Sequence, residues 1–160
     1  MIAPPLKMQL AAGAAAGLTG AILLDAFLFV TQIVAGAPPG QVISGAFTFI
    51  ASVLFGPGIA ANPAAPAIGA VIHLCVSIGW ALGYVYLVRT QPQLLVRPWI
   101  SGAGFGLVVY VFMLIVLLTA GMYHRPSPQR LENELIAHML FFGIPVALVV
   151  SRVLARPAAA

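Results

Sequence analysis

Three ionisable residues lie within long apolar runs of the sequence: Asp25, His73 and His138. An ionisable side chain is costly inside a bilayer, so each such residue is by default a functional candidate. Glu134 joins them because it precedes His138 by four residues, a spacing that places both on one face of a helix. Imidazoles and carboxylates bind transition metals and exchange protons. These four residues therefore carry most of the chemistry that the sequence offers.

A metal site is the first expectation from these residue types. Imidazole and carboxylate ligands suit a divalent cation such as zinc, copper or iron. The predicted ligand set is Asp25, His73, Glu134 and His138. A pH-responsive site is the second expectation, because histidine titrates near neutral pH. A purely structural role is the third, since hydrogen bonds between membrane helices contribute about 0.6 kcal/mol on average and can fix their register.

Haem b is a further alternative for the two histidines. His73 and His138 would be its axial ligands, and Arg125 or Arg130 would meet its propionates. The chain would then be an electron-transfer subunit. A second pair of histidines, which a transmembrane two-haem chain needs, is lacking.

The composition shows which elements must position these residues. The chain has 160 residues, of which 62% are hydrophobic and 6% charged, and its mean hydropathy is +1.09. Such a sequence has too few ionic groups to cover a water-soluble globule, and it has no basic patch for nucleic acid. Its single cysteine excludes an internal disulfide and a cysteine-based zinc or iron–sulfur site. The sequence therefore predicts an integral membrane protein.

The apolar runs predict four transmembrane helices in a single membrane domain over residues 1–160, since roughly 20 apolar residues cross a bilayer. The first run is too long for a cleaved signal peptide, so we expect the N-terminus to be retained. A fifth apolar stretch is bracketed by Pro/Gly motifs and is too short to cross, which predicts an interfacial or re-entrant helix. The predicted spans are 8–35, 68–88, 99–121 and 135–154, and the short helix is 41–56.

Charge placement predicts the orientation, because short cytoplasmic loops collect Lys and Arg. Four spans put five basic residues on one side and two, Arg125 and Arg130, on the other. Both termini are then cytoplasmic in a multi-pass protein of a bacterial inner membrane. Asp25 would lie about 24 Å from the cytoplasmic boundary of a 30 Å core, and both buried histidines come early in helices that enter from outside. The four candidate residues therefore converge in the outer leaflet.

An internal repeat predicts how the helices pair. Gly13 and Gly17 in the first span match Gly102 and Gly106 in the third, and the surroundings of the two histidines are alike. The fold class is therefore predicted to be all-α, with the four spans forming two hairpin repeats. Glycines four residues apart let helix backbones approach closely in lipid, so we expect three such pairs to build a compact bundle: Gly13/Gly17, Gly79/Gly83 and Gly102/Gly106.

This arrangement resembles small four-helix bacterial inner-membrane proteins of the YagU-like kind. The shared features are Gly-x-x-x-Gly in the odd spans, Ile50-Ala51-Ser52 with Gly56, and an early histidine followed by glycine in each even span. The resemblance implies the four-span architecture and carries over no catalytic residue.

No catalytic signature occurs in the sequence, which favours a protein that is not an enzyme. The leading hypothesis is an inner-membrane protein whose outer-leaflet cluster binds a small cation or senses pH. The alternative is a structural accessory subunit, whose glycine-rich faces would dock against other membrane subunits or a second copy of the chain.

Overall fold

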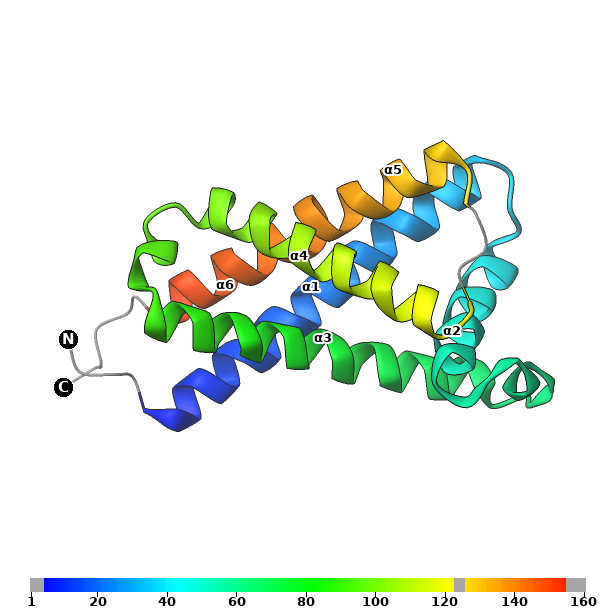
Figure 1. Ribbon diagram of the computed structural model, residues 1–160, viewed down its shortest axis with the longest axis horizontal. Coiled ribbons are helices and arrows are strands. Elements are labelled where there is room, and N and C mark those ends of the chain that lie inside the picture. Colours follow the sequence, from blue (N-terminus) through cyan, green and yellow to red (C-terminus); the bar gives the residue numbers. More distant parts are fainter. Residues whose placement is uncertain (1–4, 123–125, 155–160) are drawn as a thin grey trace.

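The computed structural model describes residues 5–122 and 126–154, and every regular element within these ranges is a helix. Four helical segments are long and apolar enough to cross a membrane, which confirms the predicted all-α class and the predicted number of helices of spanning length. They form an elongated bundle (Figure 1). The segments are α1 (Leu6–Val34), α3 (Ala65–Thr90), α4 (Pro98–Thr119) and the continuous run Pro128–Leu154.

Prolines begin most of these helices. A proline lies in the first turn of α2 (Pro39–Phe55), α3, α4 and α5 (Pro128–Ile136), where its missing N–H would have no helical partner in any case. The fourth span begins at Pro128 rather than at the predicted residue 135. Its first helix, α5 (Pro128–Ile136), is capped by Ser127, whose hydroxyl accepts a hydrogen bond from the N–H of Arg130 at 3.3 Å. Hydropathy alone missed this turn because it is polar.

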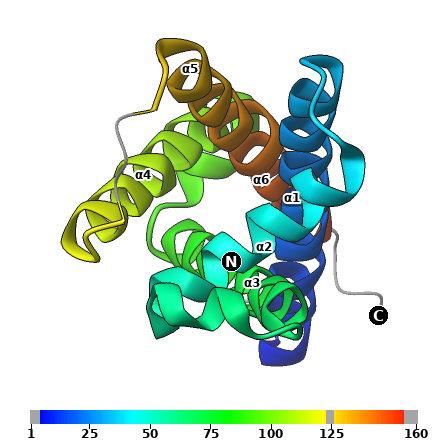
Figure 2. The same cartoon turned by 90° about the vertical axis from the view of Figure 1, so that its right-hand side faces the viewer.

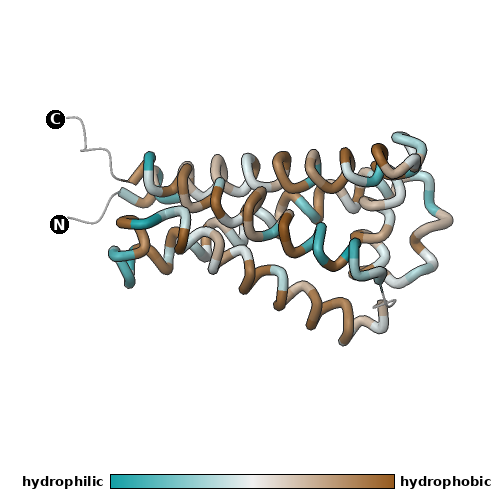
Figure 3. Tube along the Cα trace, turned by 90° about the horizontal axis from the view of Figure 1, so that it is seen from above, coloured by the Kyte–Doolittle hydropathy of each residue, from teal (hydrophilic) through white to brown (hydrophobic). Residues whose placement is uncertain are grey.

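The spans alternate in direction, so the polar connections gather at two ends. The start of α1, the connection between α3 and α4, and the end of α6 (Ile144–Leu154) share one end, which we call the basic end (Figure 1). The opposite end carries α2 and the start of α5, and we call it the α2 end. Figure 3 shows hydrophobic residues predominating between these ends. The basic end holds Lys7, Arg89, Arg97 and Arg152, while Arg125 and Arg156 lie outside the described residues.

The predicted short helix is present as α2 (Pro39–Phe55). It has 17 residues and crosses the end of the bundle rather than following its long axis (Figure 1). It packs against the first turns of α3, where Gly69 allows a close approach to the carbonyl of Phe47. A 3₁₀ turn, η1 (Pro57–Ala61), leads from it into α3. The short connection holds α2 at this end.

Glycines set the closest helix contacts within each sequential pair of spans. A Cβ atom on Gly17 of α1 would lie 2.5 Å from the Cα of Ile78 on α3, so these backbones touch. A Cβ on Gly102 of α4 would lie 2.7 Å from the carbonyl oxygen of Gly143. The predicted pairs Gly13/Gly17 and Gly102/Gly106 therefore act in helix packing. The prediction is wrong for Gly79/Gly83 on α3, because a Cβ on either of these glycines meets no atom within 4 Å. The wider repeat of two hairpins stays a prediction.

A π-helix interrupts the fourth span. The segment η3 (Ala137–Gly143) separates α5 from α6, two residues before Pro145. The sequence predicts that Pro145 leaves the carbonyl of Phe141 without its α-helical donor. In the structure the residues before Pro145 form a π-helix, which is wider than an α-helix and includes His138.

The bundle is asymmetric, because α4 packs along η3 and α6 while its backbone barely approaches α3. Figure 2 shows α4 leaning outward from the other helices at the α2 end. Side chains join α3 and α4 instead. The rings of Trp80 and Phe112 meet edge to face at 5.1 Å, and the hydroxyls of Tyr84 and Ser101 lie 2.8 Å apart.

Candidate functional site

The structure brings Asp25 and His73 together across the α1–α3 contact. The Oδ1 atom of Asp25 lies 3.2 Å from Nε2 of His73, and each side chain is about one-fifth exposed. The contact has the distance of an ion pair but not the angles of a hydrogen bond, and the buried Nε2 atom has no hydrogen-bond partner in the described part of the chain. The Gly17 contact fixes the register of the two helices about two turns from this pair.

His138 is held differently, by its own helix. Its Nδ1 atom lies 2.7 Å from the backbone carbonyl oxygen of Glu134. A carbonyl only accepts, so Nδ1 carries the hydrogen, and in the neutral ring Nε2 is then the unprotonated nitrogen. The Glu134 carboxylate is more distant, with Oε2 at 4.0 Å from Nδ1. The predicted i, i+4 pair is therefore present, but its short contact is to the backbone.

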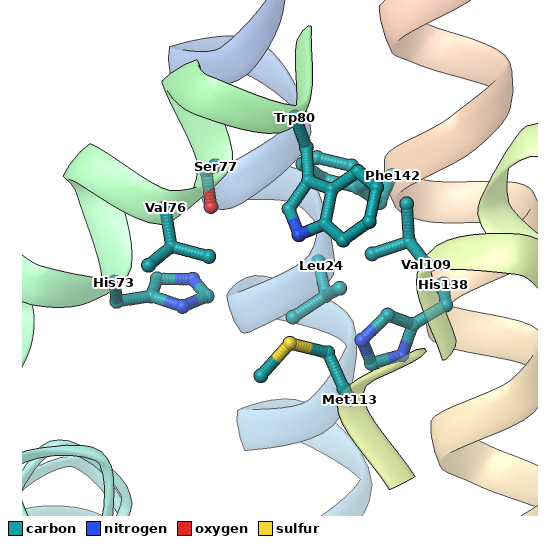
Figure 4. A pocket seen from close by; sticks show the side chains of 9 residues that line it. All are labelled: Leu24, His73, Val76, Ser77, Trp80, Val109, Met113, His138 and Phe142. Atoms are coloured by element: carbon teal, nitrogen blue, oxygen red, sulfur yellow. The ribbon is translucent and has the colours of Figure 1, made fainter. Parts of the chain in front are cut away.

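Both imidazoles line one cavity of about 60 Å³ between α1, α3, α4 and η3 (Figure 4). This juxtaposition agrees with the shared depth predicted for the two histidines. A water molecule needs roughly 10–15 Å³ of such space, so the cavity has room for a few waters or one ion. The lining residues are Leu24, His73, Val76, Ser77, Trp80, Val109, Met113, His138 and Phe142.

Aromatic side chains close the cavity toward the basic end. Trp80 meets Phe105 and Phe112 edge to face, at ring-centre distances of 6.1 and 5.1 Å. Tyr84, one turn further along α3, is almost fully buried and packs on Phe105 at 4.9 Å. The sequence predicts one polar and aromatic stripe on this helix, because successive members lie three or four residues apart: His73, Ser77, Trp80 and Tyr84. The first three line the cavity and Tyr84 is buried, so the stripe points into the bundle.

The cavity does not accommodate haem. Pockets for small organic ligands measure roughly 300–1,000 Å³, well above the volume enclosed here. His73 also directs Nε2 toward Asp25 rather than toward a shared metal. Of the two arginines predicted to meet the propionates, Arg130 lies on α5 and Arg125 falls outside the described residues. The helices would have to separate before His73 and His138 could bind a porphyrin.

The four predicted ligands form two pairs rather than one cluster. Among residues 5–122 and 126–154, no three His, Cys, Asp or Glu side chains lie close enough together to hold a metal ion. The cavity wall contains both histidines but neither Asp25 nor Glu134. The two carboxylates therefore lie outside the cavity lining, Asp25 beside His73 and Glu134 beside His138.

Sequence reasoning missed Met113, whose side chain extends from α4 into the cavity between the two imidazole rings (Figure 4). A signal for it was present. Met113 follows Gly106 by seven residues, which places both on the same face of α4. Gly106 contacts the backbone of His138, so this face turns toward the fourth span.

No protein-family model, curated protein or solved structure matches this chain. The resemblance to YagU-like proteins therefore stays a prediction. The fold itself is compatible with a multi-pass integral membrane protein, because it has four apolar helices of sufficient length.

Proposed function

We propose that this protein is a non-enzymatic integral membrane protein that binds a small cation between His73 and His138. The observation that carries the proposal is that two imidazoles from helices far apart in the sequence line one small cavity. An ionisable residue in a membrane helix is costly, and two of them at one internal site indicate a function beyond packing.

The surroundings of each imidazole support this proposal. A histidine that binds a metal through one nitrogen almost always directs the other toward a carboxylate or a backbone carbonyl. His73 has the Asp25 carboxylate 3.2 Å from Nε2, and His138 has the Glu134 carbonyl 2.7 Å from Nδ1. Each ring therefore keeps one nitrogen for a ligand.

The distribution of basic residues supports the orientation. The basic end carries four described Lys or Arg residues, and the α2 end carries Arg130. By the positive-inside rule the basic end faces the cytoplasm, which places the cavity in the outer half of a bacterial inner membrane. The cation would then enter from the external side.

Metal analysis of the purified protein tests the proposal. We expect about one bound cation per chain after expression in metal-supplemented medium, and its loss in the double variant His73→Ala, His138→Ala. Cys75→Ala is the matched control, because this thiol is exposed on α3 and does not line the cavity.

Two results would overturn the proposal: a wild-type protein without metal, or a double variant that keeps it. The first would favour a structural accessory subunit, which co-purification with a membrane partner would then support. A melting curve of the double variant in detergent shows whether it is folded.

A further inference from the structure

A third side chain with a metal-binding atom, Met113, lines the cavity beside the two histidines and indicates which cation the site would bind. Figure 4 shows the thioether of Met113 lying between the imidazoles of His73 and His138. We propose that the cation is Cu(I), bound by His73, His138 and the sulfur of Met113. This inference rests on the proposed cation site and names its ligand class.

The donor set is what favours copper in this oxidation state. Thioether sulfur is a soft ligand that selects Cu(I), and imidazole also suits copper. Hard cations such as Mg²⁺ and Ca²⁺ need several oxygen ligands. The described lining of the cavity offers only the Ser77 hydroxyl as a side-chain oxygen, and it contains no carboxylate. A site of two imidazoles and one thioether therefore matches a soft ion.

The local charge also favours a monovalent ion. The ligands are neutral, and the remaining wall is mainly apolar, with Leu24, Val109 and Phe142 among its side chains. Transferring an ion from water into such surroundings is expensive, and the cost rises steeply with its charge. Carboxylates lie beside both imidazoles, Asp25 near His73 and Glu134 near His138, but neither lines the cavity. A monovalent ion therefore costs less to transfer into this wall than a divalent one.

The geometry assigns the ligand atoms. Nδ1 of His138 donates its hydrogen to the Glu134 carbonyl, which leaves Nε2 for the metal. Nε2 of His73 faces Asp25, which leaves Nδ1. With sulfur from Met113 the site would supply three ligands. Trp80 adds an aromatic wall, whose ring face attracts cations.

The test is an anaerobic titration of the detergent-purified protein with Cu(I) against a chromophoric Cu(I) chelator, with Ag(I) and Zn(II) titrated in parallel. We expect one Cu(I) per chain and competition by Ag(I) but not by Zn(II). Met113→Leu keeps most of the side-chain volume and removes the sulfur. The affinity of Met113→Leu for Cu(I) should fall by at least roughly 10–100-fold, which is the loss caused by replacing a residue that only orients a metal ligand.

Met8→Leu is the matched control, because Met8 lies in the first turns of α1 at the basic end. It should bind Cu(I) as the wild type does. X-ray absorption at the copper edge gives a second measurement that needs no variant: selenomethionine-labelled protein should show a selenium neighbour of the metal.

The possible results separate this inference from the function on which it rests. Preferential binding of Zn(II), lost on removing both histidines, would keep the cation site and overturn the copper assignment. Unchanged Cu(I) affinity in folded Met113→Leu, or copper without a selenium neighbour, would overturn it as well. Failure to bind any of the three metals would overturn both proposals.

Discussion

The backbone of Gly106 on α4 touches the carbonyl of His138 on the π-helix, so closely that a Cβ atom on Gly106 would collide with it. The same Cβ would lie 2.7 Å from the Cα of Met139. Backbone atoms cannot move aside as the end of a flexible side chain can. This contact therefore fixes the distance between α4, which carries Met113, and the segment that carries His138.

Gly106→Ala should destabilise the protein and weaken its binding of Cu(I). Overpacking a tight contact costs about 1–3 kcal/mol, and here it would also push α4 away from η3. Thermal unfolding in detergent and the Cu(I) titration measure both effects. Gly104→Ala is the control, since a Cβ there meets no atom within 4 Å. Equal stability of the two variants would contradict the argument.

Much of the fold could be predicted because its signals are local. Apolar length gave four spans, and the Pro/Gly motifs around residues 41–56 separated α2 from them. The convergence of His73 and His138 followed from counting residues along alternating helices. Helical spacing likewise predicted that Ser77 and Tyr84 face the interior, where both are buried.

The details of the site depend on tertiary contacts that spacing does not encode. The sequence predicts one four-residue cluster, whereas the carboxylates lie outside the cavity lining and Met113 enters from a third helix. The π-helix could not be predicted from the sequence either, because Pro145 indicates a distorted helix but does not specify which helical geometry replaces it. Which helix leans away from the bundle depends on the packing of glycines against particular backbones.

Asp25→Asn should lower the affinity for Cu(I) by about 10–100-fold, the usual effect of removing a partner that orients a metal-binding histidine. The amide keeps the size of the side chain but removes the charge beside His73. Competition titration with Cu(I) measures the change. Asp25→Glu, which restores the charge, should recover part of the affinity.

Glu134→Gln removes the other carboxylate near the site, so its Cu(I) affinity can be compared with that of Asp25→Asn. His138 is oriented by the backbone carbonyl of Glu134, and the carboxylate lies 4.0 Å from the ring nitrogen. We therefore expect its affinity for Cu(I) to stay within about threefold of the wild-type value, well below the loss typical of an orienting partner. A loss as large as that of Asp25→Asn would show that both carboxylates orient the ligands.

Tyr84→Phe should destabilise the bundle without changing Cu(I) affinity. The Tyr84 hydroxyl lies 2.8 Å from that of Ser101, and this contact joins α3 to α4, whose backbones barely approach. Such hydrogen bonds between membrane helices contribute about 0.6 kcal/mol, and up to about 1.7. Thermal unfolding detects the change. Tyr86→Phe, at an exposed position on the same helix, should unfold at the wild-type temperature.

The proposed orientation can be tested by labelling single cysteines in a Cys75→Ser background. Asn62 lies in the connection between α2 and α3, and Gln91 lies in the connection between α3 and α4 at the basic end. Asn62→Cys should react with a membrane-impermeant thiol reagent in intact cells, and Gln91→Cys only after permeabilisation. The opposite pattern would put the cavity in the inner half of the membrane.

Pro145→Ala should stabilise the helix and yet weaken the metal site. Alanine restores an N–H that can donate to the carbonyl of Phe141 and removes a ring that clashes in an α-helix, a change worth up to about 3 kcal/mol. It also favours α-helical geometry through Ala137–Gly143, which would rotate His138 relative to Phe142 and disturb the cavity that both line.

A higher unfolding temperature together with weaker Cu(I) binding is therefore expected for Pro145→Ala. Pro98→Ala is the control, because a proline in the first turn of α4 displaces no helical hydrogen bond. It should change neither property. If Pro145→Ala bound Cu(I) as tightly as the wild type, the π-helix would be a consequence of the proline alone, and the position of His138 would not depend on it.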